Sequence, residues 1–177
     1  SDLILSIDEK VQYIIENIAD KAMEKHDADS VSILVSDPQT GGVLGMVNIP
    51  EFDPNNPFEG ITMEEFHERS RNTVVNDAYE PGSTMKFATI AAALDQGVIG
   101  AHEHFHCDGH IEIDGMVINC VDNVAHGDLD IAGILLHSCN VGTVKIAQRL
   151  GIDHFQKYLD AFGFGAPTGI DLPGESA

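Results

Sequence analysis

Hydrophobic residues recur at two different spacings along this chain, and the spacing changes from one segment to the next. In residues 8–25 they fall at helical intervals behind Asp8, whose side chain can cap a helix start. Residues 30–36 and 43–47 are short apolar runs separated by a turn with proline and glycine, which predicts an antiparallel hairpin. We therefore expect one amphipathic helix followed by two paired strands.

Past the hairpin the pattern is mainly helical. Residues 50–60 contain three prolines and indicate an extended loop, after which Thr62 and Glu65 form a capping box for a short helix. Three later helices are expected at about 129–137, 141–150 and 153–162. Phe162 and Phe164, which flank Gly163 at the end of the last helix, are expected in the core.

The run 84–94 is apolar at nearly every position apart from Lys86. This pattern predicts a helix that is buried on almost all sides and ends near Gly97. Only two strands are recognised, both near the front, whereas the helices are consecutive. The order favours an α+β fold in which a helical subdomain is inserted into an antiparallel sheet whose remaining strands lie beyond Ala177. We expect residues 1–60 to form the first helix and hairpin, and residues 61–177 the helical subdomain.

Acidic residues dominate the charge of the chain. Its 177 residues include 9 Lys and Arg against 29 Asp and Glu, for a net charge of −20. Nucleic acids and anionic membranes are bound by basic patches, so this balance argues against both partners. The sequence has no positively charged leader with an apolar core, and no apolar run near the roughly 18 residues of a membrane span. We expect any export signal or anchor to lie outside it.

Ser83 and Lys86 form a candidate catalytic pair. They lie one helical turn apart after a Pro-Gly turn, so their side chains share a face. A second polar triplet, Ser138-Cys139-Asn140, lies between two predicted helices. From spacing alone two interpretations stay open. In the first, the two serines and Asn140 are helix caps and Lys86 extends to water. In the second, Ser83 is a nucleophile with Lys86 as its base, and the triplet is a second catalytic motif.

All three cysteines fall in or just after a stretch rich in histidine and glycine. Cys107, Cys120, His126 and Cys139 make a donor set that fits a closed tetrahedral zinc site. The competing interpretation is a Cys107–Cys120 disulfide with Cys139 left as a buried thiol. Four nearby histidines could replace one of these ligands, namely His102, His104, His106 and His110.

These motifs resemble those of the transpeptidase domain of class B penicillin-binding proteins, the cell-wall enzymes of division, elongation and sporulation. The S-x-x-K motif is at Ser83 and the S-x-N motif at Ser138, whereas the third motif, K-[ST]-G, is absent from the chain. Flanking segments in the family's order are 36–41, 43–46, 50–55, 71–72, 79–82, 126–127 and 168–175. The resemblance implies a penicillin-recognising, β-lactamase-like serine transpeptidase fold, with residues 1–177 as its N-terminal part.

The resemblance also implies a reaction, namely acyl transfer on a peptidoglycan stem peptide ending in D-Ala-D-Ala. Ser83 would be the nucleophile, Lys86 its base and Ser138 a carrier of the proton. Asn140 would hydrogen-bond the backbone amide of the substrate. β-Lactam antibiotics would acylate Ser83 by the same attack. The parent would lie on the extracytoplasmic face of the bacterial membrane behind an N-terminal span, and its implied partner is a glycosyltransferase of the cell-wall machinery.

Some class B relatives hold zinc beneath the S-x-N loop, which implies structural Zn²⁺ at the four-residue donor set here. Cys139 would then point inward while Ser138 and Asn140 face the cleft. Two rival functions share part of the signal. A class D type β-lactamase or β-lactam sensor also has S-x-x-K, and a non-catalytic zinc-binding interaction module would explain the His/Cys stretch. This chain alone is expected to acylate slowly, because by resemblance one oxyanion donor lies on a strand outside it.

Overall fold

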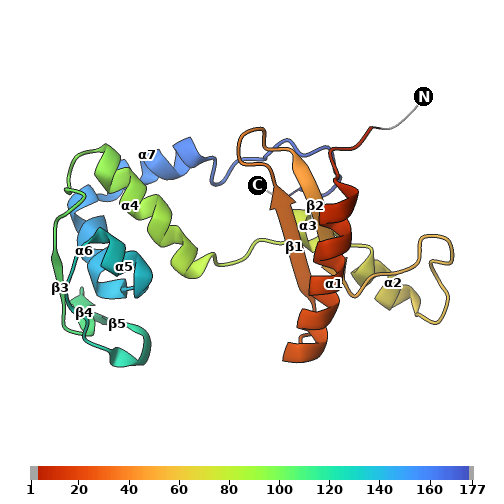
Figure 1. The fold of residues 1–177 in the computed structure, drawn as a ribbon, viewed down its shortest axis with the longest axis horizontal. Coiled ribbons are helices and arrows are strands. Elements are labelled where there is room, and N and C mark those ends of the chain that lie inside the picture. The colour runs from red at the N-terminus through yellow and green to blue at the C-terminus, as the bar shows by residue number, and fades with distance from the viewer. Residues whose placement is uncertain (1–3, 176–177) are drawn as a thin grey trace. The chain divides into compact units, whose positions relative to one another are not determined.

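The computed structural model describes residues 4–175, which form two compact units (Figure 1). Among these residues, unit 1 comprises 4–78 with 169–175, and unit 2 comprises 79–168. The division falls at residue 78 and not at the expected residue 60. The reason is that Asn72 and Thr73 hydrogen-bond to Asn48 in the hairpin, which holds the intervening segment in unit 1.

Unit 1 contains the predicted helix and hairpin. Its elements are α1 (Glu9–His26), β1 (Val31–Ser36), β2 (Val43–Ile49), α2 (Met63–Arg69) and α3 (Thr73–Asn76). The Asp8 side chain accepts hydrogen bonds from two backbone N–H groups of the first turn of α1, as predicted. The two strands are antiparallel, and Ile15 and Ala19 of α1 pack with Val47 of β2 in a small core. Thr62 forms the predicted capping box at the start of α2.

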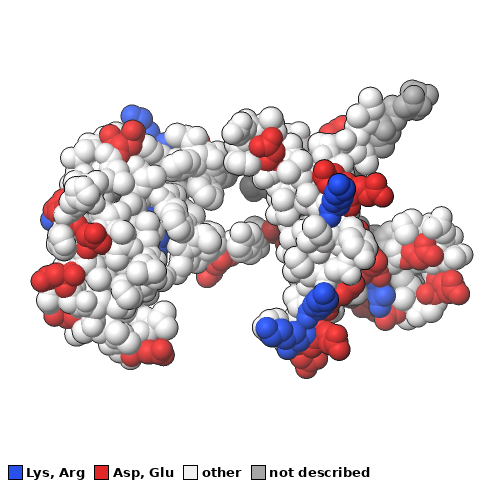
Figure 2. Space-filling model, viewed as in Figure 1, with Lys and Arg blue, Asp and Glu red and all other residues white. Residues whose placement is uncertain are grey.

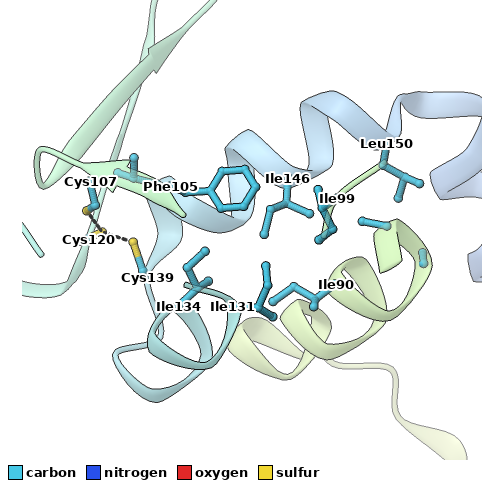
Figure 3. Close-up of a cluster of buried hydrophobic side chains, with 13 residues drawn as sticks. Ile90, Ile99, Phe105, Cys107, Cys120, Ile131, Ile134, Cys139, Ile146 and Leu150 are labelled. Atoms are coloured by element: carbon cyan, nitrogen blue, oxygen red, sulfur yellow. Dashed lines mark hydrogen bonds between the residues drawn. The ribbon is translucent and has the colours of Figure 1, made fainter. Parts of the chain in front are cut away.

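Unit 2 carries the larger core. Its helices are α4 (Met85–Asp95), α5 (Ile131–Leu136), α6 (Asn140–Leu150) and α7 (Ile152–Phe162), with 3₁₀ turns η1 (Gly82–Thr84) and η2 (Val121–Asn123). Its strands are β3 (Phe105–Cys107), β4 (His110–Ile113), β5 (Met116–Asn119) and β6 (Gly127–Leu129). Buried isoleucines from α4, α5 and α6 meet Phe105 in one apolar cluster, and the three cysteines lie at one end of it (Figure 3). The three late helices are thus confirmed.

The expectation of only two strands is wrong, because unit 2 adds two antiparallel pairs, β3 with β6 and β4 with β5. Asp114 and Gly115 connect β4 to β5, with φ angles of 50° and 81°. A two-residue hairpin turn with positive φ at both positions strongly favours Asp-Gly, so the sequence carried this signal. β3 and β6 have three residues each, which is too short to show an alternating pattern.

Helix α4 ends as predicted, but it is buried on one side only within the described part of the chain. Phe87 is 63% exposed, and Phe162 and Phe164, which were expected in the core, are 53% and 48% exposed. These three rings line an open apolar pocket together with Ala88 and Ala91. The run of alanines has almost no polar face, so its periodicity could not identify the exposed side.

The surface of both units is rich in acidic groups. Figure 2 shows acidic side chains spread over the visible faces, with basic side chains gathered mainly over α1. This distribution agrees with the net charge of −20 and offers no basic groove for a phosphate backbone on the face shown. Among residues 4–175, no helix combines the length and apolar character needed to cross a membrane.

Candidate active site

The predicted nucleophile lies at the start of α4. Gly82 has a φ of 58°, a left-handed conformation that glycine adopts without strain, and it turns the chain into the 3₁₀ turn that holds Ser83. Lys86 follows in the first turn of α4, and its Nζ lies 3.2 Å from the Ser83 Oγ. The Ser83 side chain is on the surface of unit 2, whereas Lys86 is only 8% exposed.

The second motif is delivered by the connection between α5 and α6. Ser138 has a φ of 49°, which is unusual for a residue with a side chain and turns the chain sharply before α6. The Ser138 Oγ donates to the Ser83 Oγ at 2.9 Å, and Lys86 Nζ donates to the Asn140 Oδ1 at 2.6 Å. The structure therefore brings together all four residues that the sequence singled out, Ser83, Lys86, Ser138 and Asn140.

The Lys86 amine has four oxygen neighbours within hydrogen-bond distance. Two of them only accept, the Ser138 carbonyl and the Asn140 Oδ1, each at 2.6 Å. A neutral amine has two N–H donors, which these acceptors would use, and its lone pair would then face the hydroxyls of Ser138 at 2.8 Å and Ser83 at 3.2 Å. The geometry suits an amine that takes a hydroxyl proton.

Burial lowers the pKa of Lys86 below its ordinary value of 10.5, because the charged ammonium loses hydration. The sulfurs of Cys139 and Cys120 act in the opposite direction, since negative charge on them favours the ammonium, but burial outweighs them. A lysine with a lowered pKa is a stronger candidate for a general base near neutral pH than an exposed one.

The Asn140 amide also contacts a residue that the sequence did not single out. Its Nδ2 donates to the main-chain carbonyl of Asn119, at the end of β5, at 2.7 Å. A backbone carbonyl has no side-chain signature, so motif analysis could not find it. The Asp-Gly turn of the β4–β5 hairpin was the one available signal.

The predicted metal ligands converge beneath the same motif. One ligand atom from each of Cys107, Cys120, His126 and Cys139 lies within 4.8 Å of the others, and all three cysteines are buried. Sulfur separations are 3.6 Å for Cys107–Cys120 and 3.7 Å for Cys120–Cys139, and the sulfurs point toward one another in Figure 3. Zn–S bonds of about 2.3 Å in a tetrahedron place sulfurs about 3.8 Å apart, so the spacing fits.

The thiols differ in how readily they ionise. Burial raises the pKa of Cys107, but hydrogen bonds from the backbone N–H groups of His126 and Gly109, with the His126 ring, outweigh it and bring the pKa to about 6. Burial raises the pKa of the Cys139 thiol to about 12, and the neighbouring sulfurs of Cys107 and Cys120 add to that shift. Several thiolates this close repel one another, and a divalent cation among them would reverse that repulsion.

The two alternatives, a Cys107–Cys120 disulfide and a different histidine as ligand, fit the structure less well. Cys107 and Cys120 are free thiols, and His106 instead lies between the carboxylates of Asp128 at 2.7 Å and Asp108 at 3.0 Å. Cys139 has no exposed surface and caps α6 by accepting from the Gly142 N–H at 3.3 Å. Its sulfur therefore faces the cysteine cluster, while the side chains on either side of it face Lys86.

Comparisons with known proteins agree with the resemblance found in the sequence motifs. The family model described as "Penicillin binding protein transpeptidase domain" matches residues 31–177. Stage V sporulation protein D of Bacillus subtilis is 38% identical over 175 residues, which is 98% of this chain and 26% of that protein. The probable peptidoglycan D,D-transpeptidase PenA of Neisseria gonorrhoeae is 34% identical over 176 residues, 99% of this chain and 29% of the relative. The chain thus spans less than a third of these relatives.

Solved structures agree with the fold. Penicillin-binding protein 3 of Mycobacterium tuberculosis, in complexes with aztreonam and with ampicillin, superposes with a TM-score of 0.86 at 30% identity. The match covers 99% of this chain and 38% of that one. The expected α+β fold of the penicillin-recognising type is therefore confirmed.

Proposed function

Since the chain belongs to the family of penicillin-binding protein transpeptidase domains, we propose that the protein is a peptidoglycan D,D-transpeptidase that works through an acyl-enzyme on Ser83. The observation that carries the proposal is the set of contacts around one buried amine. Lys86 Nζ lies within 3.2 Å of Ser83, Ser138 and Asn140. The relatives favour neither a class D type β-lactamase or sensor nor a non-catalytic zinc module, and PenA is named a probable peptidoglycan D,D-transpeptidase.

In the first half-reaction the Ser83 Oγ attacks the carbonyl carbon of the penultimate residue in a stem peptide ending in D-Ala-D-Ala. Lys86 takes the hydroxyl proton, so the attacking oxygen becomes a competent nucleophile. The C–N bond then breaks, and the departing D-alanine nitrogen receives a proton. Ser138 is suited to pass it on, because its hydroxyl lies 2.8 Å from the amine and 2.9 Å from the Ser83 Oγ.

In the second half-reaction an amine from a neighbouring strand attacks the ester carbon. A new amide bond forms as the attacking amine gives up a proton to Lys86, the C–O bond to Ser83 breaks, and the serine oxygen regains that proton from Lys86, directly or through Ser138. Asn140 would hold the peptide in place with an amide N–H. The short K-[ST]-G motif is not in these 177 residues. By resemblance, the strand that provides one of the two oxyanion donors also lies outside them, so the chain alone should acylate slowly.

β-Lactams should enter the same path and stop there. Attack by Ser83 opens the lactam amide, but the amine stays tethered, so the acyl-enzyme persists. The experiment is the intact mass of the full-length protein after incubation with ampicillin, with Ser83→Ala and Ser83→Cys as variants. The wild type should gain the mass of the drug and Ser83→Ala should not. An adduct of equal yield on Ser83→Ala would overturn the assignment.

The four-residue cluster is proposed to hold a structural Zn²⁺. Cys107, Cys120, His126 and Cys139 would be its ligands, and the donor set, the burial and the sulfur spacing support this. When bound, zinc supplies no chemistry to the reaction and acts as a cross-link between loops. The residues of this chain do the positioning, because Cys139 joins the cluster to Ser138 and Asn140 along the backbone.

The cellular setting follows from the family and is part of the same proposal. The domain would act on the extracytoplasmic face of the cell membrane, where peptidoglycan is assembled, with the protein anchored by a span outside these residues. A cell-wall glycosyltransferase is the expected partner, because cross-linking needs newly made strands. Labelling of intact cells with a membrane-impermeant fluorescent penicillin tests the location.

A further inference from the structure

The β4–β5 hairpin contacts the candidate active site through the main-chain carbonyl oxygen of Asn119. That oxygen accepts from Asn140 Nδ2 at 2.7 Å, while Asn140 Oδ1 accepts from Lys86 at 2.6 Å. The Asn140 amide is therefore held at both ends. If it rotated by half a turn, its NH₂ would face the N–H donors of Lys86 and its oxygen would face the Asn119 carbonyl, and both pairs would repel.

The hairpin register explains why this carbonyl is available. The Cys120 N–H donates to the Gly109 carbonyl at 2.8 Å, and His110 lies opposite Asn119. Antiparallel pairs alternate between hydrogen-bonded and non-hydrogen-bonded positions, so the pair next to Gly109 and Cys120 is non-hydrogen-bonded. The N–H and C=O of Asn119 therefore point away from β4. A slip of one residue would turn this carbonyl into the hairpin.

Both ends of the hairpin fix that register. At the tip, the two-residue turn at Asp114 and Gly115 sets which residues pair. At the base, Cys120 is buried in the cysteine cluster, and Gly109 packs so closely that a Cβ there would lie 2.6 Å from the Asn123 carbonyl. The position of the Asn119 carbonyl is thus fixed from both ends of the hairpin.

We infer that the Asn119 carbonyl, presented by the β4–β5 hairpin, is a positioning group that sets the orientation of the Asn140 amide for the substrate peptide. A carboxamide has two N–H donors, and Asn119 takes one, which leaves the second for a carbonyl of the bound peptide. The inference rests on the proposed function, because it assigns Asn140 to the peptide. It adds that the hairpin turn, whose φ angles are positive at Asp114 and Gly115, acts on catalysis through that amide.

The test is a double-mutant cycle in the full-length protein, with the second-order rate of acylation by a fluorescent penicillin as readout. Gly115→Val strains the turn, because a β-branched residue disfavours a φ of 81°, and it should slow acylation about tenfold. Asparagine tolerates that conformation, so the Gly115→Asn variant should be acylated at close to the wild-type rate. Gly97→Val is the matched control, since Gly97 also has positive φ and open space for a Cβ but lies outside the hairpin.

The cycle partner is Asn140→Ala, which removes the amide through which the hairpin is inferred to act. In that background Gly115→Val should change the rate less than twofold, whereas a general loss of folding would still cost tenfold. Equal losses in both backgrounds, or an equal loss for Gly97→Val, would overturn the inference and leave the proposed function intact. If Gly115→Val does not fold, Gly115→Ala takes its place in the cycle, and Gly115→Asn stays the tolerated replacement. A wild type that no penicillin acylates would overturn both.

Discussion

Gly142 on α6 packs closely against Ile134 on α5 in the core of unit 2. A Cβ on Gly142 would lie 2.8 Å from both the Cδ1 and the Cγ1 of Ile134, a side chain with no exposed surface. The same Cβ would lie 3.5 Å from the Cys139 sulfur. Gly142→Ala should therefore push α6 away from α5, and with it Asn140 at the start of α6.

The size of the effect follows from two opposing terms. Overpacking a tight core costs about 1–3 kcal/mol, whereas alanine in place of glycine within a helix gains about 1 kcal/mol. The net loss for Gly142→Ala should be about 1 kcal/mol, or about 2–4 °C in Tm for a domain of this size. Because the change displaces Asn140, the rate of penicillin acylation should also fall, by about tenfold.

The assay combines thermal unfolding with penicillin acylation of four proteins: wild type, Gly142→Ala, Ile134→Val and the double variant. Ile134→Val removes Cδ1, one of the two crowded atoms, and alone should cost about 1 kcal/mol. In the Gly142→Ala background, Ile134→Val should lower the free energy of unfolding by less than that, or raise it. Gln148→Ala, at an exposed position of α6, is the control. Strictly additive losses, or a Gly142→Ala protein as stable and as fast as wild type, would refute the close approach.

Two further predictions concern titration and metal. Acylation should rise with pH through the Lys86 pKa, which burial holds below 10.5, and Lys86→Arg, which stays charged, should lose the reaction; a flat pH–rate profile would contradict this. Stability should also rise with pH between the Lys86 pKa in the fold and 10.5, since the unfolded chain binds more protons there. Protein purified without a histidine tag should contain about one zinc per chain, and Cys139→Ser should lower both zinc content and Tm; full zinc in Cys139→Ser would remove Cys139 from the ligands.

The sequence predicted the side chains of the candidate site better than the backbone groups that hold them in place. Ser83 and Lys86 are one turn apart on a helix, and Ser138 and Asn140 flank a helix start, so local spacing was enough to predict which side chains share a face. That both pairs meet at one amine depends on the contact between α4 and α6, which brings Lys86 beside Asn140, 54 positions later in the sequence. The resemblance to a known family supplied that contact, and periodicity did not.

The misses have specific physical causes. The Asp114–Gly115 turn was an available signal, but its strands are too short to alternate clearly, and the pairing of β3 with β6 joins residues that are distant in sequence. Phe162 and Phe164 are apolar and yet half exposed in the described chain, because composition does not say which neighbour covers a side chain. The left-handed backbone of Ser138 could not be foreseen, since serine rarely adopts it.

The position of Cys139 has a consequence for how the protein opens. Segments from β3, the end of β5, the loop before β6 and the start of α6 all meet at the cysteine cluster, and β5 is tied again to α6 through Asn119. Local opening of a protein proceeds in cooperative units, and linked segments open together. Residues 107–140 should therefore behave as one such unit, so that Ser138 and Asn140 are either both in place or both lost. Fluctuations too small to break the cluster should therefore leave Ser138 and Asn140 in place together.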